Sequence, residues 1–287
     1  MLRSMYSGIS GMKGFQTKLD AIGNNIANVN TYGYKKGRTT FQDMMSQTVS
    51  GAQAPTTDFL GGRNPSQIGL GSKVGTIDTI HTQGNRQTTN RPLDLAIEGD
   101  GMFMVAKDVA DGLENATLSF TRAGNFYLDN DGYIVDTNGQ FLIGEGVDNG
   151  ALNGDSARLR IPPEAESFSI QSDGTVTYVE GTEAITAGRV RLAKFSNPDG
   201  LEKLGGNSFR LTNNSGLELF GPNNQLNLEI PGQGGTGQTV AGALEMSNVD
   251  LAEEFTEMIT AQRGFQANTR IITTSDEILQ ELVNLKR

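Results

Sequence analysis

Both ends of this chain carry apolar residues at helical spacing, and that pattern restricts the folds open to it. Near the C-terminus an apolar residue recurs at every seventh position, and near the N-terminus apolar residues are three, four or seven positions apart. A helix with such a stripe needs a partner that covers it. All eight prolines lie between residues 55 and 231, so both ends lack the strongest helix breaker. The sequence predicts two terminal helices that pair through these residues: Leu2, Met5, Ile9, Met12, Leu19, Ile26, Leu251, Phe255, Met258, Phe265, Ile272 and Leu279.

The charges of the two ends are opposite in sign. Up to residue 40 there are six basic residues against Asp20 alone, and from Glu245 onward there are eight acidic residues against four basic ones. Each exposed ion pair adds only about 0.3–0.5 kcal/mol, but the signs favour pairing of unlike helices. The alternative is a pair of ordinary surface helices on a globular core.

Both predicted helices are weak by themselves. Four glycines interrupt the first helix, and each costs about 1 kcal/mol relative to alanine. In the last helix we expect Gln262, Thr269 and Asp276 at the second seam position, which would make the apolar stripe narrow. We therefore expect helices that order when neighbouring molecules bury them.

Between the ends, residues 31–75 predict a connector and residues 76–245 a β-rich body. Asparagines at 24–30 favour the end of the first helix, and the stretch from Ser46 to Gly75 has the composition of a loop or extended connector. Further on, Leu93–Glu98 alternates apolar and polar residues as a half-buried strand does. Glycine-containing turns at 130–132, 138–139 and 173–174 predict hairpins. The expected fold class is α+β, with residues 1–30 and 246–287 as a coiled-coil-like helical assembly domain and an all-β body inserted between them.

Composition excludes several classes of protein. There is no cysteine for a disulfide, a thiolate metal site or a thiol nucleophile, and there is one histidine. The net charge of −10 argues against a nucleic-acid partner. No stretch has the roughly 18 apolar residues of a membrane span, so no membrane insertion is expected. The first residues also lack the apolar core of a cleaved secretion signal.

Three local patterns resemble sites but have simpler interpretations. Asp129, Asp131 and Gly132 suggest a calcium loop, but the first and twelfth ligand positions would be Tyr127 and Asn138, so a hairpin turn is expected. Residues 232–237 fit the glycine pattern of a dinucleotide site without the helix that should follow, which favours a flexible connector. His81 has no second ligand nearby and is expected at the surface. No catalytic, metal-binding or cofactor-binding residue is predicted.

Motifs at both ends resemble the rod and hook family of flagellar axial proteins. Ser7–Met12, Ala27–Thr31 and Gly33–Lys35 match the N-terminal signature, and Ser247–Asp250 and Ala261–Phe265 match the C-terminal one. The resemblance continues through Gly99–Phe103 and Thr121–Phe126. The motif residues taken as functional are Ala27, Asn28, Asn30, Thr31, Gly33, Ser247, Asn248, Gln262 and Arg263.

The resemblance implies a structural subunit, not an enzyme, that is exported without cleavage by the flagellar type III apparatus. The first expectation is a hook subunit, self-assembling outside the cell into a tubular, flexible joint that transmits torque, with terminal helices inside and the body outside. Implied partners are copies of itself, other axial and junction proteins, the hook cap and the export apparatus.

The alternative is the distal rod, a rigid drive shaft of the basal body. This chain has no room for the large extra domain of many hook proteins, and residues 46–75 are where hook and rod should differ. An exported enzyme acting on cell-wall glycan and a calcium-dependent adhesin are the expectations from other classes, although no paired acid and base is found for the first.

Overall fold

The computed structural model describes residues 2–55, 61–109, 113, 116–148, 151–181, 183–217 and 226–285. The chain divides into two compact units. The first comprises Met1–Ala27, Gly37–Ile80 and Asp250–Arg287, and the second comprises Asn28–Lys36 and His81–Val249. The first unit contains both long helices and the second is built of strands, so the fold is α+β.

The helices of the first unit are α1 (Leu2–Ala27) and α2 (Leu251–Leu285). The asparagine-rich stretch ends α1, and the next residues form a turn in which the Thr31 amide donates to the Asn28 carbonyl at 3.1 Å. Asp250 caps α2, because its Oδ1 accepts from the Ala252 amide at 2.8 Å. Glu253 and Glu254 in the first turn favour the helix start through the dipole.

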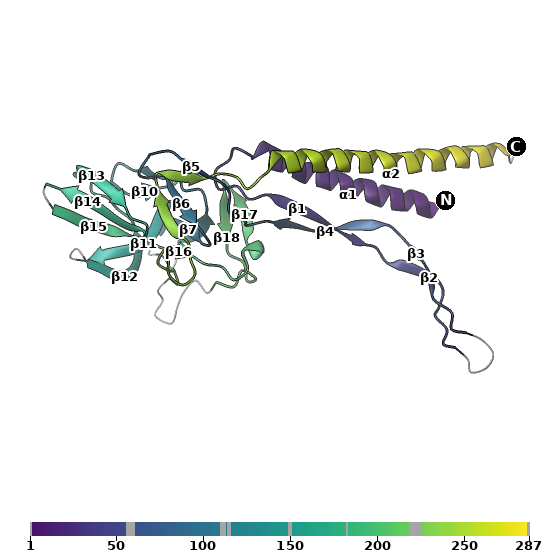
Figure 1. The fold of residues 1–287 in the computed structure, drawn as a ribbon, viewed down its shortest axis with the longest axis horizontal. Coiled ribbons are helices and arrows are strands. Elements are labelled where there is room, and N and C mark those ends of the chain that lie inside the picture. Colours follow the sequence, from purple (N-terminus) through teal and green to yellow (C-terminus); the bar gives the residue numbers. More distant parts are fainter. Residues whose placement is uncertain are drawn as a thin grey trace. The chain divides into compact units, whose positions relative to one another are not determined.

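Residues 37–50 and 66–79 of the first unit form paired strands, which differs from the expected loop or extended connector. Strand β1 (Gly37–Asp43) pairs antiparallel with β4 (Ser72–Thr79), and β2 (Ser46–Ser50) pairs antiparallel with β3 (Ser66–Gly69). Figure 1 shows them as a long two-stranded ribbon, called the arm below. Most side chains of β2 and β3 are polar and exposed, so the alternation that identifies a half-buried strand is absent from these two segments.

The second unit is organised around a large sheet with the strand order β13-β14-β15-β11-β7-β8-β18-β17. Two smaller antiparallel pairs, β6–β19 and β5–β20, complete the unit in the part of the chain that the structure describes. A short 3-10 turn spans Pro198–Gly200. The strands are β5 (Arg86–Thr88), β6 (Leu95–Glu98), β7 (Met102–Lys107), β8 (Thr117–Thr121), β9 (Tyr127–Leu128), β10 (Ile134–Val135), β11 (Phe141–Asp148), β12 (Ala151–Arg158), β13 (Ser167–Ile170), β14 (Thr175–Glu180), β15 (Glu183–Val190), β16 (Leu192–Ala193), β17 (Glu202–Gly205), β18 (Ser208–Arg210), β19 (Gln238–Ala241) and β20 (Ala243–Glu245).

The core of this unit lies on both faces of β7. Phe103 and Val105 belong to one apolar cluster, while Met102, Met104 and Ala106 belong to another, as the alternation of side chains along a strand requires. Edge-on ring contacts lie in both clusters, at 5.3 Å between Phe103 and Phe126 and at 5.0 Å between Phe120 and Phe195. The sheet is therefore buried on both sides at its centre, and this explains why β7 is a continuous apolar run.

The three predicted hairpin turns are confirmed. The turn at 130–132 joins β9 to β10, that at 138–139 joins β10 to β11, and that at 173–174 joins β13 to β14. Gly132, Gly139 and Gly174 all have positive φ, between 74° and 82°, which explains the glycine in each turn.

Two local expectations are wrong. The glycine-rich segment 232–237 is an ordered turn rather than a flexible connector: the Gly232 amide donates to the Gly237 carbonyl at 3.0 Å, and Thr236 is buried. The second concerns the strand after Leu93, expected to be half-buried. Ala96 faces the opposite side from its neighbours Leu95 and Ile97, yet it is only 3% exposed, so both sides of β6 are covered.

Candidate functional site

The two terminal helices pack antiparallel, side by side, within the first unit (Figure 1). A methyl group added at Gly8 of α1 would lie 3.4 Å from Ile272 Cγ1 of α2, late in that helix. Near the other end, Lys18 Nζ of α1 lies 3.1 Å from Glu257 Oε2 of α2. This ion pair joins the basic end of the chain to the acidic end.

Glycines allow the helices to approach closely. A methyl group at Gly11 would lie 2.8 Å from Asn268 Nδ2, and one at Gly264 would lie 2.6 Å from Cζ of Phe15. The ring of Phe15 also lies 5.8 Å from that of Phe41 on β1. Glycines that weaken the isolated helices therefore give the packed pair its close contact.

In the structure, some of the predicted seam residues are partly buried and others are exposed. Partly buried are Met5, Met12, Leu19, Ile26, Met258, Phe265, Ile272 and Leu279. Ile9, Leu251 and Phe255 are 37%, 40% and 49% exposed, and the side chain of Leu2 lies outside the described residues. The second seam position also differs from expectation, because the buried residues are Ala261 and Ser275 whereas Gln262 and Asp276 are exposed. Small residues fill that position, so apolarity alone did not reveal it.

A buried polar contact between the helices was missed in the sequence. Asn25 Nδ2 lies 3.2 Å from both carboxylate oxygens of Glu254 and donates to the Gly37 carbonyl at 2.9 Å. In return, the Gly37 amide donates to Asn25 Oδ1 at 3.0 Å. Spacing is the sequence signal that could have revealed this contact. Glu254 lies seven residues before the buried Ala261, and Asn25 lies three residues after the buried Ile22, so each shares a helix side with a buried residue.

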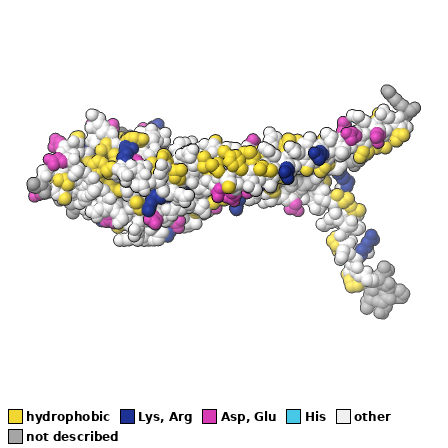
Figure 2. Space-filling model, turned by 45° about the horizontal axis from the view of Figure 1, so that its top comes forward, with side chains coloured by type: hydrophobic (Ala, Val, Ile, Leu, Met, Phe, Trp, Pro, Cys, Tyr) yellow, Lys and Arg dark blue, Asp and Glu magenta, His cyan; other side chains and the backbone are white. Residues whose placement is uncertain are grey.

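Apolar side chains remain exposed on α2. At 3.6 residues per turn, Leu251, Phe255 and Ile259 share one side of the helix, and a second group lies on another side nearer the C-terminus. The second group is Ile271, Ile278, Leu282 and Leu285. Figure 2 shows apolar side chains near the C-terminal end of this helix, next to acidic ones. Pairing with α1 therefore leaves surface that other helices can cover.

The arm also exposes apolar side chains, although its strands are polar overall. Met45, Val49 and Ile77 are 84%, 63% and 60% exposed. Such side chains on a strand pair outside any core are typical of surfaces that other chains cover.

Three charged side chains are buried together in the second unit, at the places where the chain enters and leaves it. Lys35 Nζ lies 2.5 Å from Glu245 Oε1, and Arg122 Nη1 lies 3.0 Å from Glu245 Oε2. Lys35 also donates to the Thr82 carbonyl at 2.7 Å. Burial would raise the pKa of Glu245, but the charges of Arg122 and Lys35 and the hydrogen bonds to the carboxylate outweigh it and lower that pKa.

Several motif residues hold the entry and exit segments to each other. The Gly33 amide donates to the Glu245 carbonyl at 2.8 Å, and the Lys36 amide donates to Asn248 Oδ1 at 2.7 Å. Gly33 has a φ of 68°, and a methyl group there would lie 2.5 Å from the Ala123 amide nitrogen, so only glycine fits. Asn248 Nδ2 also donates to Thr82 Oγ1 at 3.0 Å.

The remaining motif residues are more dispersed. Thr31 Oγ1 donates to Asn28 Oδ1 at 3.1 Å, and Ser247 is buried with its Oγ accepting from the Val249 amide at 3.3 Å. The exposed members are Ala27, Asn30, Gln262 and Arg263.

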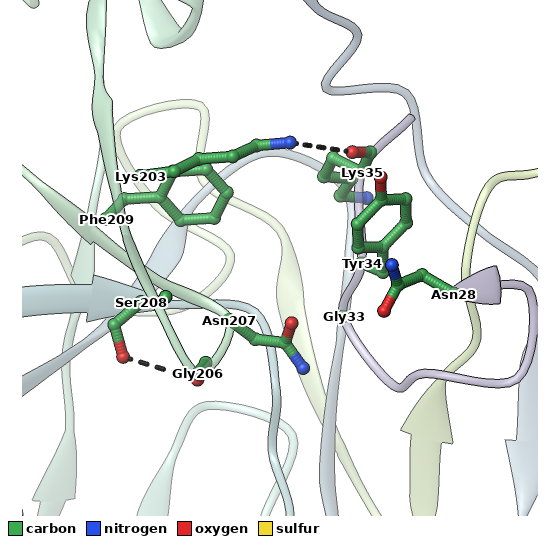
Figure 3. A pocket seen from close by; sticks show the side chains of 10 residues that line it. Asn28, Gly33, Tyr34, Lys35, Lys203, Gly206, Asn207, Ser208 and Phe209 are labelled. Carbon is green, nitrogen blue, oxygen red and sulfur yellow. Dashed lines mark hydrogen bonds between the residues drawn. The ribbon is translucent and has the colours of Figure 1, made fainter. Parts of the chain in front are cut away.

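A cavity of about 200 Å³ lies between the entry segment and the β17–β18 hairpin (Figure 3). Lys203 reaches across it and donates to the Lys35 carbonyl at 3.1 Å, with its Nζ 5.1 Å from the centre of the Tyr34 ring. Asn207 Nδ2 donates to the Tyr32 carbonyl at 2.8 Å. These contacts fix the entry segment against the sheet.

The expectation that His81 is a surface residue is wrong. Both ring nitrogens are buried and have no hydrogen-bond partner in the described part of the chain, and the ring lies 5.3 Å from that of Phe209. Burial lowers the pKa of His81 to about 4, and the charges of Lys35, Arg122 and Lys203 add to this effect. The histidine is therefore neutral at pH 7.

Within the described ranges, no group of three acidic or histidine side chains is arranged to hold a metal ion. No described helix is long and apolar enough to cross a membrane.

Comparison with known proteins assigns the family. Residues 5–35 match the flagella basal body rod protein family, residues 96–178 match the flagellar hook protein FlgE/F/G D1 domain, and residues 240–285 match the C-terminal family of flagellar basal body rod FlgEFG proteins. The chain belongs to the flagellar rod and hook family and is an axial structural protein of the flagellum.

The individual relatives include both rod and hook proteins. The chain is 55% identical to the flagellar basal-body rod protein FlgG of Bacillus subtilis (strain 168), over all of both chains. It is 36% identical to the rod protein FlgG of Borreliella burgdorferi and 30% identical to the hook protein FlgE of the same organism, again over all of each chain. The alignment with the hook protein runs over 457 positions, so that protein holds long segments that this chain of 287 residues lacks.

Proposed function

We propose that this chain is a subunit of the distal rod of the flagellar basal body, where copies assemble into a rigid tubular drive shaft. The observation that carries the proposal is the similarity, at 55% identity and near-equal length, to a basal-body rod protein. The hook subunit, our first expectation, has less support, because the hook relatives are longer and less similar.

The terminal helices are the proposed assembly device. In the tube, the α1–α2 pair forms a coiled-coil-like unit, and neighbouring pairs cover the exposed apolar residues of α2. Residues such as Phe255 and Ile259 then contribute through burial that only the polymer provides, at about 25 cal/mol per Å² of apolar surface.

The arm is the proposed source of rigidity. A tube bends when its rows of subunits slide past one another, and a paired ribbon with exposed apolar side chains can bind neighbouring copies and resist sliding. The other proposed partners are axial and junction proteins of the flagellum and its export apparatus, which the chain uses without cleavage. No catalytic activity is part of this function.

Deletion of the gene tests the proposal through electron microscopy of purified basal bodies. Truncated rods that lack hooks are expected. Complete rods that lack only the hook would instead assign this chain to the hook. Complementation with the unaltered gene controls for effects on other genes.

A further inference from the structure

We propose that an arginine–aromatic surface of the second unit binds Glu180 and Glu183, at the end of the β14–β15 hairpin, of a neighbouring copy of this chain. The surface consists of Arg158 and Arg160 over the rings of Tyr133 and Phe141. The inference rests on the proposed function, because it requires copies that assemble.

The geometry of this surface holds the two guanidinium groups in place. Arg158 Cζ lies 4.8 Å from the centre of the Tyr133 ring and 5.3 Å from that of Phe141, and Arg160 Cζ lies 5.6 Å from that of Tyr133. Arg160 Nε also donates to the Asp131 carbonyl at 2.9 Å. Stacking on rings restricts these exposed side chains, so less entropy is lost when they bind a carboxylate.

Among the residues that the structure describes, these two arginines have no charge partner. Arg91 also stacks on a ring, that of Tyr127, but its Nη1 lies 3.4 Å from Asp94 Oδ1. In the described part of the chain, Arg158 and Arg160 have no carboxylate within 4.0 Å, although the chain has 33 acidic residues against 23 basic ones. Both are exposed, so they are available to another molecule. Arginine and tyrosine are among the residues enriched at the energetic hot spots of protein interfaces.

The matching acidic element is the end of the β14–β15 hairpin. Glu180 and Glu183 are directly opposite in the strand pairing and both are exposed. Like charges opposite each other destabilise a strand pair, and no basic side chain compensates them among the described residues. Two guanidinium groups from another molecule would remove the repulsion and form charge-assisted hydrogen bonds.

Charge complementarity favours a second copy as the occupant. Copies with a net charge of −10 repel one another, so a polymer of them needs local contacts of opposite sign. The chain carries both groups of charges that such a contact needs. Arg158 and Arg160 lie at the end of β12 and just after it, whereas Glu180 and Glu183 lie on β14 and β15. A contact made head to tail in this way can propagate along or around a tube.

Charge reversal tests the proposal in the full chain, expressed in cells that lack the natural gene. Arg158→Glu with Arg160→Glu, and separately Glu180→Arg with Glu183→Arg, are each expected to reduce the number of rods per cell at least tenfold by electron microscopy. All four changes together are expected to restore rods. Single Arg158→Glu should also reduce the number of rods, whereas Lys107→Glu, an equal charge change at another exposed residue, is its control and should leave the rods unchanged.

The other outcomes overturn the proposal. Normal rods in both double variants would show that this contact is not used, while the distal rod function would stand on the deletion result. Loss of rods without rescue by the fourfold variant would assign the arginines to a different acidic partner. Loss of soluble, folded protein, checked by circular dichroism, would make the residues structural.

Chemical crosslinking provides a readout that does not depend on assembly defects. Because the chain has no cysteine, Asp131→Cys and Ala184→Cys place the only thiols beside the two halves of the contact. A bifunctional maleimide is expected to give dimers and higher multimers in intact basal bodies and none in dispersed protein. Either single cysteine variant alone should give no crosslinked multimers. If the double variant also gives none in intact rods, the proposed contact is contradicted.

Discussion

At the scale of single residues, the Glu245 carboxylate is the centre of the buried ion cluster. Its carboxylate neutralises two buried cations and accepts from the Gly84 amide at 2.9 Å. Removing one partner of such a cluster leaves an uncompensated charge in the interior. Because the same cluster joins the entry and exit segments of the second unit, its loss affects the backbone that continues toward both helices.

Replacing this carboxylate is expected to be costly. Glu245→Gln should lower the free energy of unfolding by about 3–5 kcal/mol, measured by denaturant unfolding. Glu202→Gln is the matched control, because Glu202 pairs with Arg210 at 2.6 Å but both side chains are more than half exposed, and it should cost less than about 1 kcal/mol. Equal effects would mean that the buried cluster has no special structural role.

Protonation of His81 should appear in the pH dependence of stability. Its pKa is about 4 in the folded chain and 6.5 in the unfolded chain, so the unfolded state takes up the proton first as the pH falls. The contribution of neutral His81 to the free energy of unfolding is fully present above pH 6.5. It is lost as the pH falls from 6.5 to 4, and the loss reaches a maximum of about 3 kcal/mol.

His81→Gln isolates this effect, since it keeps a polar side chain that does not titrate. The variant should lose less stability than the unaltered chain between pH 6.5 and 5, a range above the ordinary pKa of carboxylates. Parallel curves for the two proteins would show that the histidine does not titrate in this range.

Among the elements, the two helices show how far the sequence alone reaches. The heptad spacing predicted the helices, and the opposite charges of the two ends favoured their pairing, although the particular Lys18–Glu257 pair was not predicted. The positions of Ala261 and Ser275 could not be predicted, because small buried residues carry no hydrophobic signal. The arm was missed for a related reason: β2 and β3 are exposed almost throughout, and the period-2 alternation on which strand prediction depends is absent there.

In the second unit, too, some features could be predicted from the sequence and others could not. Hairpin turns followed directly from glycine chemistry, since positive φ has a local cause. His81 and the Lys35–Glu245–Arg122 cluster depend on contacts between distant residues, which one sequence does not reveal.

Two glycines of the helices should respond oppositely to alanine. Gly264→Ala places a methyl group 2.6 Å from the Phe15 ring, so we expect a lower melting temperature and weaker helix pairing. Gly23→Ala meets nothing within 4 Å and should raise helix stability by up to about 1 kcal/mol. Circular dichroism at 222 nm during heating compares them. Stabilisation by both changes would show that the helices are not in close contact at Gly264.

For the whole molecule, the exposed apolar residues of α2 separate folding from assembly. Phe255→Ser with Ile259→Ser should leave the unfolding curve of the monomer nearly unchanged, because both side chains are about half exposed. The same variant should fail to form rods in cells, since neighbouring subunits are proposed to cover these residues. Gln266→Ser, another exposed position of the same helix, is the control. Normal rods in the double variant would contradict a role for this side of α2 in assembly.

The most direct test of the distal rod proposal is a cryo-electron microscopy map of the hook–basal body from cells that express this chain. The account predicts that the side chains of this sequence fit the straight axial segment below the hook, with α1 and α2 in the inner layer and Phe255 and Ile259 covered by neighbouring subunits. A map in which this sequence fits the curved hook instead, or in which these residues face an open channel, would contradict it.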